Sequence, residues 1–264
     1  MIQKEALEVI SSSLMKDPLV QTVFVKGSIG RGEEDEHSDI DLYCLIREED
    51  EAEFLMNRLE HLRKYRDLLF YEDFFIIAPQ IIAVYDNLLH VDLFTVTEKT
   101  FKEKDYFKVL YDPKGLMDKF RMSQNLLLSI EEFDGHAYDV AWYLFQYRKA
   151  FKRGNDIWAV EMLQFVTTNL SKVLLHRYYP ERAQLGTKAL SSLLPQKQLN
   201  EVTEIFNNST PLSHEKAVSK IIRVLQREME WIVSMLDEDS QAGHFLERMI
   251  FILKEELDVL NDKR

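Results

Sequence analysis

The spacing of hydrophobic residues changes character partway along the chain. In roughly the first 100 residues, segments with helical spacing alternate with short apolar runs that are typical of strands. The expected helices cover 2–17 and 49–65, and the expected strands cover 20–27, 39–46, 67–74, 80–86 and 88–96. This mixture predicts an α+β (α/β) domain with a mixed sheet, which we place at residues 1–112.

Beyond Pro113 the pattern is helical throughout. The expected helices are 136–153, 155–178, 196–207, 213–237 and 241–261, with boundaries expected at Gly135, Gly154, Pro180, Pro195, Pro211 and Gly243. Glycine and proline are the usual punctuation of helices. Long amphipathic helices with short connections are typical of a bundle, so we expect residues 113–264 to form a C-terminal helical bundle.

Composition is that of a globular protein. Hydrophobic residues make up 46% of the chain and charged residues 30%, and there are only eight glycines and six prolines. Because no run of about 18 apolar residues occurs and the first residues lack the pattern of a signal peptide, we expect a cytoplasmic protein with no membrane partner. Cys44 has no second cysteine to pair with and is expected in the core.

The net charge restricts the choice of partners. Thirty-three basic residues against 45 acidic ones give −12 at pH 7. Such a chain repels polynucleotides unless basic residues are concentrated in one patch, and the sequence contains no such block. We therefore expect no nucleic-acid partner, and a neutral or cationic small molecule fits the charge better.

Two features in the first domain point to chemistry. Three of the eight glycines, Gly27, Gly30 and Gly32, fall within six residues, just before Asp39 and Asp41. Residues i and i+2 of a strand point to the same face, so these two aspartates project together. Parallel carboxylates repel unless a cation lies between them, and an oxygen-rich site of this kind suits Mg²⁺.

The glycines fit a phosphate-binding turn. Gly27 ends the strand expected at 20–27 and Ser28 follows it, and a residue without a β-carbon there lets phosphates approach backbone N–H groups. The Ser28 hydroxyl can donate a hydrogen bond, and Arg31 can neutralise phosphate charge. Asp-x-Asp and Gly-Ser are each common alone, but their conjunction around an apolar strand is rare.

The segment "KGSIGRGEEDEHSDIDLYCLI" resembles the signature of the polymerase-β-type nucleotidyltransferase superfamily. That signature is hydrophobic-Gly-Ser, a spacer, and then two aspartates alternating with hydrophobic residues. The resemblance implies a third carboxylate on a later strand, which "LLHVDLFTV" supplies as Asp92. Several antibiotic-modifying relatives carry Glu at this position, so the role of Asp92 as base or metal ligand stays open. His90 begins the same strand and can face the site, but no role is assigned to it.

The layout of the chain is similar to that of the small antibiotic nucleotidyltransferases. "YDPKG", "KAFKRGNDIWAVEML" and "GHFLERMIFILKEEL" most resemble the lincosamide group, and the aminoglycoside enzymes are more distant relatives with the same plan. The resemblance implies transfer of a nucleoside monophosphate from an NTP, which we expect to be ATP, to a hydroxyl of a lincosamide- or aminoglycoside-type antibiotic. Pyrophosphate is released, and the activity would confer antibiotic resistance.

The same resemblance assigns roles to the site residues. Asp39 and Asp41 would hold one or two Mg²⁺ ions, and Asp92 would accept the acceptor's proton or complete the metal site. Gly27, Ser28 and Arg31 would bind the nucleotide phosphates, as their chemistry also suggests. The helical bundle would contribute to acceptor binding.

Two alternatives remain open from the sequence. One is nucleotidylation of a protein target, as in antitoxin-like enzymes, which are commonly smaller. The other is a non-catalytic nucleotide-binding module, against which the three intact carboxylates weigh. The sequence does not choose the nucleotide or the acceptor, and it leaves open whether a homodimer forms.

Overall fold

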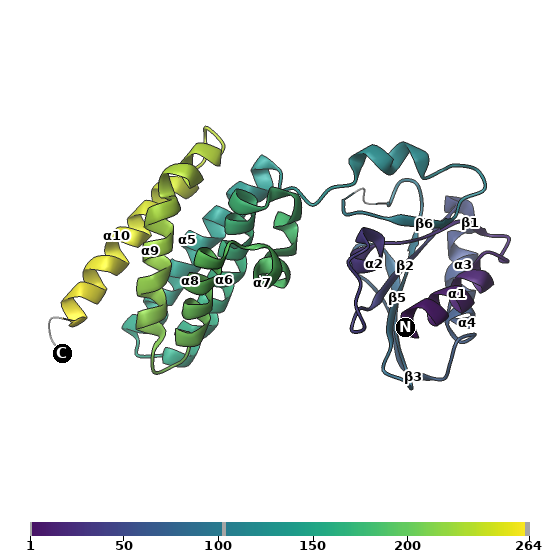
Figure 1. Cartoon of the computed structure of the whole chain (residues 1–264), viewed down its shortest axis with the longest axis horizontal. Helices are drawn as coiled ribbons and strands as arrows, with labels where there is room; N and C mark the ends of the chain where they lie inside the picture. The colour runs from purple at the N-terminus through teal and green to yellow at the C-terminus, as the bar shows by residue number, and fades with distance from the viewer. Residues whose placement is uncertain (1, 102–103, 262–264) are drawn as a thin grey trace. The chain divides into compact units, whose positions relative to one another are not determined.

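The computed structural model describes residues 2–101 and 104–261. The chain forms two compact units, Met1–Asn125 and Leu126–Arg264 (Figure 1). The sequence placed the boundary after residue 112, but residues 113–125 lie in the first unit. Met117 and Phe120 explain this later division, because both are buried in a cluster with the sheet residues Phe24 and Tyr43.

The first unit is built on a mixed six-stranded sheet, as expected. Its strands are β1 (Val20–Val25), β2 (Ile40–Ile46), β3 (Leu68–Phe75), β4 (Pro79–Tyr85), β5 (His90–Val96) and β6 (Lys108–Tyr111). Their order is β3-β4-β5-β2-β1-β6. The pairing is antiparallel except between β2 and β5, which run parallel. Strand β6 was not predicted, because its four residues are too short to show alternation.

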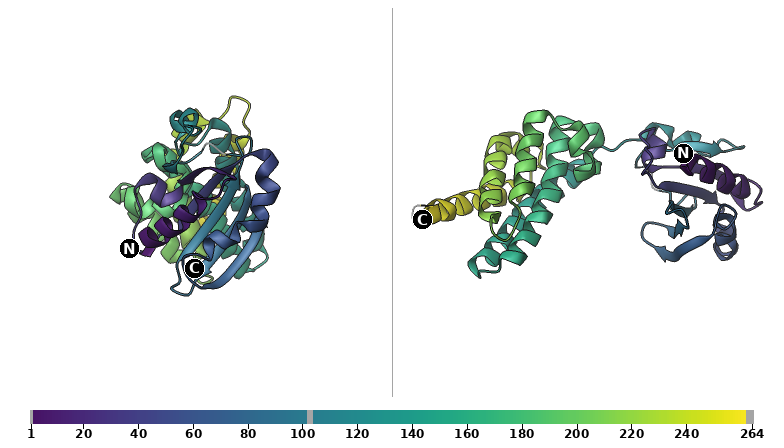
Figure 2. Two further views of the ribbon diagram at one scale, coloured as in Figure 1. Left: turned by 90° about the vertical axis from the view of Figure 1, so that its right-hand side faces the viewer. Right: turned by 60° about the horizontal axis from the view of Figure 1, so that its bottom comes forward.

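Helices cover one face of this sheet. α1 (Ile2–Leu14), α3 (Glu51–Asn57) and α4 (Leu59–Leu62) contribute Ala6, Ile10, Leu14, Phe54 and Leu62 to a core with the strands. Cys44 lies in this core, as predicted. The single helix expected at 49–65 is instead a short 3-10 turn η1 (Glu48–Asp50) followed by α3 and α4. Figure 2 shows the first unit from two further directions.

Aromatic side chains fill part of the opposite face. Phe24, Tyr43 and Phe94 stand in a row on β1, β2 and β5, with centroid distances of 5.2 Å and 4.4 Å between successive rings. Phe101 and Phe107 pack against them, together with Phe120 from the 3-10 helix η2 (Asp118–Ser123). The apolar row borders the polar end of the sheet, where β2 and β5 begin.

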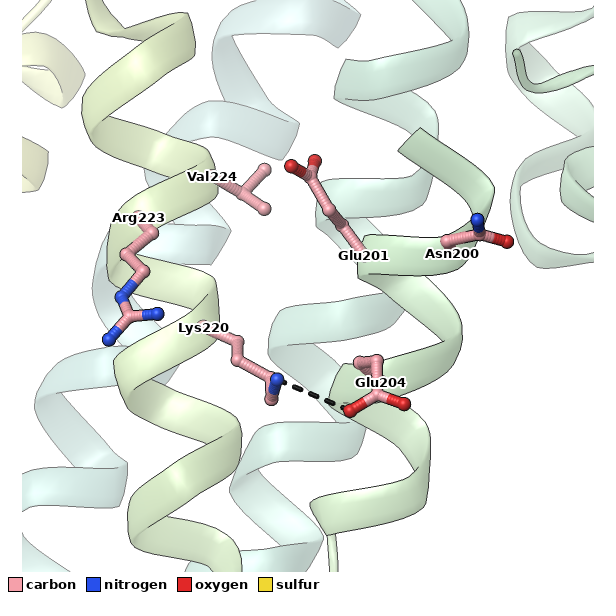
Figure 3. A pocket seen from close by; sticks show the side chains of 6 residues that line it. All are labelled: Asn200, Glu201, Glu204, Lys220, Arg223 and Val224. Carbon is pink, nitrogen blue, oxygen red and sulfur yellow. Dashed lines mark ion pairs between the residues drawn. The ribbon is translucent and has the colours of Figure 1, made fainter. Parts of the chain in front are cut away.

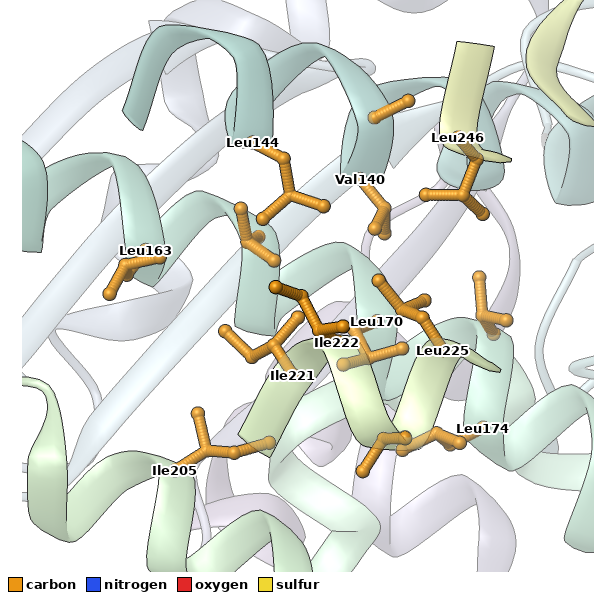
Figure 4. Close-up of a cluster of buried hydrophobic side chains, with 14 of the residues drawn as sticks. Val140, Leu144, Leu163, Leu170, Leu174, Ile205, Ile221, Ile222, Leu225 and Leu246 are labelled. Atoms are coloured by element: carbon orange, nitrogen blue, oxygen red, sulfur yellow. The ribbon is translucent and has the colours of Figure 1, made fainter. Parts of the chain in front are cut away.

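The second unit is helical, as expected. Its elements are α5 (Ile130–Lys152), α6 (Asp156–Tyr178), η3 (Pro180–Ala189), α7 (Leu190–Leu193), α8 (Gln196–Asn208), α9 (His214–Met235) and α10 (Ala242–Asn261). Side chains from α5, α6, α8, α9 and α10, among them Leu144, Leu170, Ile205, Ile221 and Leu246, form one buried cluster (Figure 4).

The start of the first long helix differs from the prediction. We expected a boundary at Gly135, but α5 begins at Ile130 and Gly135 lies inside it. Ser129 caps the helix, accepting a hydrogen bond from the Glu132 backbone N–H while the Glu132 side chain accepts one from the Ser129 N–H. This capping box satisfies two free backbone donors, so the helix starts before its first glycine. Among the described residues, no helix combines the length and apolar character needed to cross a membrane.

Candidate active site

The register of the sheet brings the predicted carboxylates together. In the parallel pairing of β2 with β5, Asp41 is the direct partner of Asp92. Asp39 lies two residues before Asp41, immediately before β2, and therefore projects on the same side. Asp92 is buried, whereas the side chain of Asp39 is 49% exposed. The three carboxylates thus line one end of two adjacent strands, with one open to solvent.

A glycine turn closes over Asp41. Instead of ending in a simple turn after β1, the chain enters the short helix α2 (Gly27–Arg31). The backbone N–H of Lys26 donates to the Asp41 carbonyl over 3.0 Å, which fixes this entry against β2. Gly27 has φ +60°, and a β-carbon there would lie 1.9 Å from Asp41 Oδ2. Only glycine allows the turn to approach the carboxylate this closely.

Ser28 holds a hydroxyl without a partner. Its Oγ is buried and makes no hydrogen bond within the described part of the chain. A buried polar group normally has a partner, and an exception calls for an explanation. Ser28 is the second residue of α2, beside the first-turn N–H groups that a helix leaves unpaired. A ligand oxygen placed there would satisfy the hydroxyl.

The neighbouring charges perturb Asp41. The pKa of Asp41 is raised to about 6, first by burial and then by the negative charges of Asp39, Asp92 and Asp105, against a lowering by His90. The Gly27 turn, which lies directly against the Asp41 carboxylate, contributes to this burial. Asp41 is therefore costly to ionise until a cation is near.

His90 lies between two of the carboxylates. Its Nε2 is 3.1 Å from Asp92 Oδ1, and its Nδ1 is 3.8 Å from Asp39 Oδ2. The hydrogen bond to Asp92 raises the pKa of His90, and the charges of Asp92, Asp39 and Asp41 add to the effect. The sequence held a signal for this position, because His90 precedes Asp92 by two residues in a strand and so shares its face.

Two further charged residues near the carboxylates, Lys26 and Asp105, were not predicted from the sequence. Lys26 is buried, its Nζ lies 5.5 Å from the Tyr43 ring centroid, and it donates to the Lys104 carbonyl. Burial lowers the pKa of Lys26, while the charges of Asp105 and Asp41 raise it. Asp105 lies in a loop at φ +71°, an unusual backbone for a residue other than glycine. No periodicity of the sequence marks a loop residue of this kind.

Arg31 is engaged by carboxylates. Its Nε lies 2.7 Å from Glu33 and its Nη1 lies 2.9 Å from Asp105, with only 11% of the side chain exposed. The guanidinium is therefore close to the site but already neutralised. A contact between Arg31 and a phosphate, which the sequence predicts, requires it to exchange at least one of these partners.

Helix α1 holds the acidic loop before Asp39 in place through hydrogen bonds. Residues 33–36 are exposed, and the His37 side chain is 84% exposed, so this loop is open to solvent. The Gln3 amide nitrogen of α1 donates to the carbonyls of Asp35, Glu36 and Ser38 over 3.3, 2.9 and 3.0 Å. These bonds fix the backbone that delivers Asp39 to the site.

The carboxylates fit a divalent cation bound together with a nucleotide. A cation beside Asp41 would relieve the repulsion that raises its pKa. Across residues 2–101 and 104–261, no three or more His, Cys, Asp or Glu side chains form a complete metal-binding group. Mg²⁺ commonly takes only one or two protein carboxylates and fills its remaining positions with water and substrate phosphates. Asp39, Asp41 and Asp92 suit that mode of binding.

A pocket in the helical unit has a different character. It lies between α8 and α9, has a volume of about 230 Å³, and is lined by Asn200, Glu201, Glu204, Lys220, Arg223 and Val224 (Figure 3). Lys220 pairs with Glu204 at 3.2 Å, and Arg227 pairs with Glu201 at 2.6 Å. Both acidic side chains are already paired across the two helices, so we interpret the pocket as a surface groove whose ion pairs stabilise the packing of α8 against α9.

Comparison with known proteins agrees with this geometry. Residues 8–84 match the family model "Polymerase beta, Nucleotidyltransferase". The matched segment includes Gly27, Ser28, Asp39 and Asp41 and ends before Asp92. The similarity to this family therefore covers the part of the first unit that carries the glycine turn and the first two carboxylates. No curated protein matches the sequence at a significant level.

Two solved structures resemble the whole chain weakly. An aminoglycoside 6-adenyltransferase from Bacillus subtilis has 11% sequence identity and a TM-score of 0.39, over 96% of this chain and 98% of that one. A nucleotidyltransferase-like protein from Exiguobacterium sibiricum has 10% identity and a TM-score of 0.35, over 98% of this chain and 75% of that one. Similarity at this level does not bear on the substrate.

Proposed function

We propose that this protein transfers a nucleoside monophosphate from an NTP, with ATP as our first choice, to a hydroxyl of a small molecule, with release of pyrophosphate. The observation that carries the proposal is the direct pairing of Asp41 with Asp92 beneath the Gly27 turn. Transfers of this type need little covalent chemistry from the protein and depend on positioning and charge.

The chain's own residues divide the work. Asp39 and Asp41 would hold Mg²⁺, which when bound neutralises the charge of the phosphates. Ser28 would donate its hydroxyl hydrogen to a phosphate oxygen, which supplies the partner that its buried Oγ lacks. Arg31 would turn from its carboxylate partners toward the pyrophosphate as negative charge builds there.

Asp92 would handle the acceptor's proton. One of its oxygens, Oδ1, lies 3.1 Å from His90 Nε2, a contact that orients the carboxylate and would leave Oδ2 for the acceptor hydroxyl. As a base it would draw the proton from that hydroxyl, and such help is typically worth about 10²–10⁴-fold in rate. As a metal ligand it would complete the carboxylate set instead.

A lincosamide- or aminoglycoside-type antibiotic is the acceptor we propose, with the helical bundle contributing contacts to it. The support is the net charge of −12, which favours a cationic or neutral molecule over a polynucleotide. Nucleotidylation of a protein target is the second candidate, supported by the same site but by no separate observation.

The test is label transfer from α-³²P-labelled ATP, GTP, CTP and UTP, each with Mg²⁺. Every reaction is run with a panel of lincosamides and aminoglycosides, with whole-cell lysate, and without acceptor. We expect label on a small molecule, and its absence from the same reactions with the Asp41→Asn variant. Label on a protein would favour the second candidate, and no label on any acceptor would refute transferase activity.

A further inference from the structure

The face of the sheet that carries the carboxylates continues past Asp92 onto β4 and β3. Asp92 pairs directly with Ile82 of β4, and Ile82 pairs directly with Glu72 of β3. Direct partners in neighbouring strands project on the same face, so the row Asp41, Asp92, Ile82 and Glu72 crosses four strands. At about 4.8 Å per strand spacing, Glu72 stands roughly 10 Å from Asp92.

Apolar side chains surround Glu72 on this face. Phe70 and Phe74 lie two residues to either side of it and therefore point the same way. Phe70 is 50% exposed, and Phe74, Ile82 and Val84 are half-buried. The result is an accessible strip of aromatic and aliphatic surface with one carboxylate in its middle.

Glu72 makes no hydrogen bond and no ion pair with any residue in the described ranges 2–101 and 104–261. The adjacent Asp73 shows the contrast, since it points to the opposite face and binds Arg58 Nη2 over 2.6 Å. A carboxylate between two aromatic rings attracts a cation in two ways, through its own charge and through the electron-rich ring faces.

We propose that Phe70, Glu72 and Phe74 bind a cationic group of the acceptor. The chemical class is an amine with an apolar portion, whose ammonium lies at Glu72 and whose reacting hydroxyl lies about 10 Å away beside Asp92. The location of that hydroxyl rests on the proposed transferase function, whereas the binding of an ammonium at Glu72 does not. The acidic net charge of the chain adds a general attraction for such a molecule.

A matched pair of probes tests the binding without turnover. Benzylammonium and benzyl alcohol have nearly the same shape, but only the first is charged. We titrate each into the full chain and follow the methyl NMR signals of Ile82 and Val84. We expect benzylammonium to bind at least about fivefold more tightly, as one charge-assisted contact supplies, and Glu72→Gln to abolish that preference.

The control variant is Glu53→Gln. Glu53 is likewise an exposed carboxylate, but it lies on α3, which packs on the opposite face of the sheet. The Glu53→Gln variant should keep the wild-type preference for benzylammonium over benzyl alcohol. A preference that survives in Glu72→Gln, or benzylammonium shifts that avoid Ile82 and Val84, would overturn the proposal.

Turnover gives a second and separable readout. With a cationic acceptor, Glu72→Gln should raise the acceptor KM about tenfold, leave kcat within about threefold, and leave the nucleotide KM unchanged. An unchanged acceptor KM would overturn this inference while the transferase function stands. If no acceptor is labelled at all, the transferase function fails, and the probe titration still decides whether Glu72 binds an ammonium.

Discussion

Gly27 lies so close to Asp41 that a β-carbon on the glycine would stand 1.9 Å from the aspartate's Oδ2. The turn that is proposed to hold phosphate and the carboxylate that is proposed to hold metal are thus in direct contact. Each of the two positions restricts what the other can be.

Gly27→Ala should abolish Mg²⁺-dependent nucleotide binding, because the methyl group displaces the Asp41 carboxylate. Gly32→Ala is the matched control, since Gly32 also has positive φ, at +71°, but has no atom within 4 Å of its would-be β-carbon. Both variants pay about 1–3 kcal/mol for the left-handed backbone. Calorimetric titration with an NTP and a melting curve separate the effects. Equal binding by the two variants would contradict the importance of the contact.

Ser28→Ala should weaken nucleotide binding without harming the fold. The hydroxyl has no partner to lose within the described structure, so the melting temperature should stay the same or rise slightly. Loss of one hydrogen bond to a charged phosphate costs about 1.5–3 kcal/mol, which is roughly a tenfold to hundredfold loss of affinity. The measurement is the nucleotide Kd together with the melting temperature. A lower melting temperature with unchanged affinity would assign Ser28 to the fold alone.

Asp41→Asn should stabilise the metal-free protein at neutral and alkaline pH. The pKa of Asp41 is raised to about 6 from the ordinary value of 3.8 for an aspartate, so its charged form is disfavoured in the folded state. The penalty is absent below about pH 4, grows as pH rises through the interval up to about 6, and is complete above it. We expect a gain of roughly 1–3 kcal/mol in unfolding free energy at pH 8.

The measurement for Asp41→Asn is urea unfolding in EDTA at pH 4 and pH 8. At pH 4 the variant and the wild type should be equally stable, because both carry a neutral group at this position. The same variant should lose label transfer with Mg²⁺. A wild type that is more stable than the variant at pH 8 would show that Asp41 gains more from its charge than burial costs it.

Asp92→Asn separates the role of base from the role of metal ligand. The amide keeps the shape of the side chain but cannot take a proton, so kcat should fall by at least about 10²-fold if Asp92 is the base. The affinity for MgNTP would then be nearly intact. A fall in nucleotide affinity together with rate would identify a ligand. Full turnover with an unaltered pH profile would remove Asp92 from the mechanism.

Periodicity in the sequence predicted much of the fold, and contacts between distant segments explain what it missed. Strands β1 to β5 and the long helices have clear patterns, whereas β6 has only four residues. The boundary between the units shifted because Met117 and Phe120 pack on the sheet, a long-range contact that local spacing does not encode. The sequence predicted a helix boundary at Gly135, but the capping box at Ser129 sets the start of α5.

The candidate site shows the same division. Alternation alone places Asp39 with Asp41 on one side of a strand, and His90 with Asp92 on one side of another. The pairing of Asp41 with Asp92 depends on which strands lie side by side, and that comes from the whole sheet. The engagement of Arg31 by Asp105 has no local signal, because it joins a helix to an irregular loop.

The parallel pairing of β2 with β5 has a consequence for how the protein folds. Strands β3, β4 and β5 pair antiparallel in chain order over short loops, and β1 and β2 pair antiparallel over the 14 residues 26–39. The parallel pairing needs a crossover of more than 40 residues between Ile46 and His90. Contacts across so long a segment of chain are slow to form. We therefore expect the two groups to form first and to dock along β2 and β5 last. Nucleotide binding would then be among the final properties regained during refolding, after most of the secondary structure has returned.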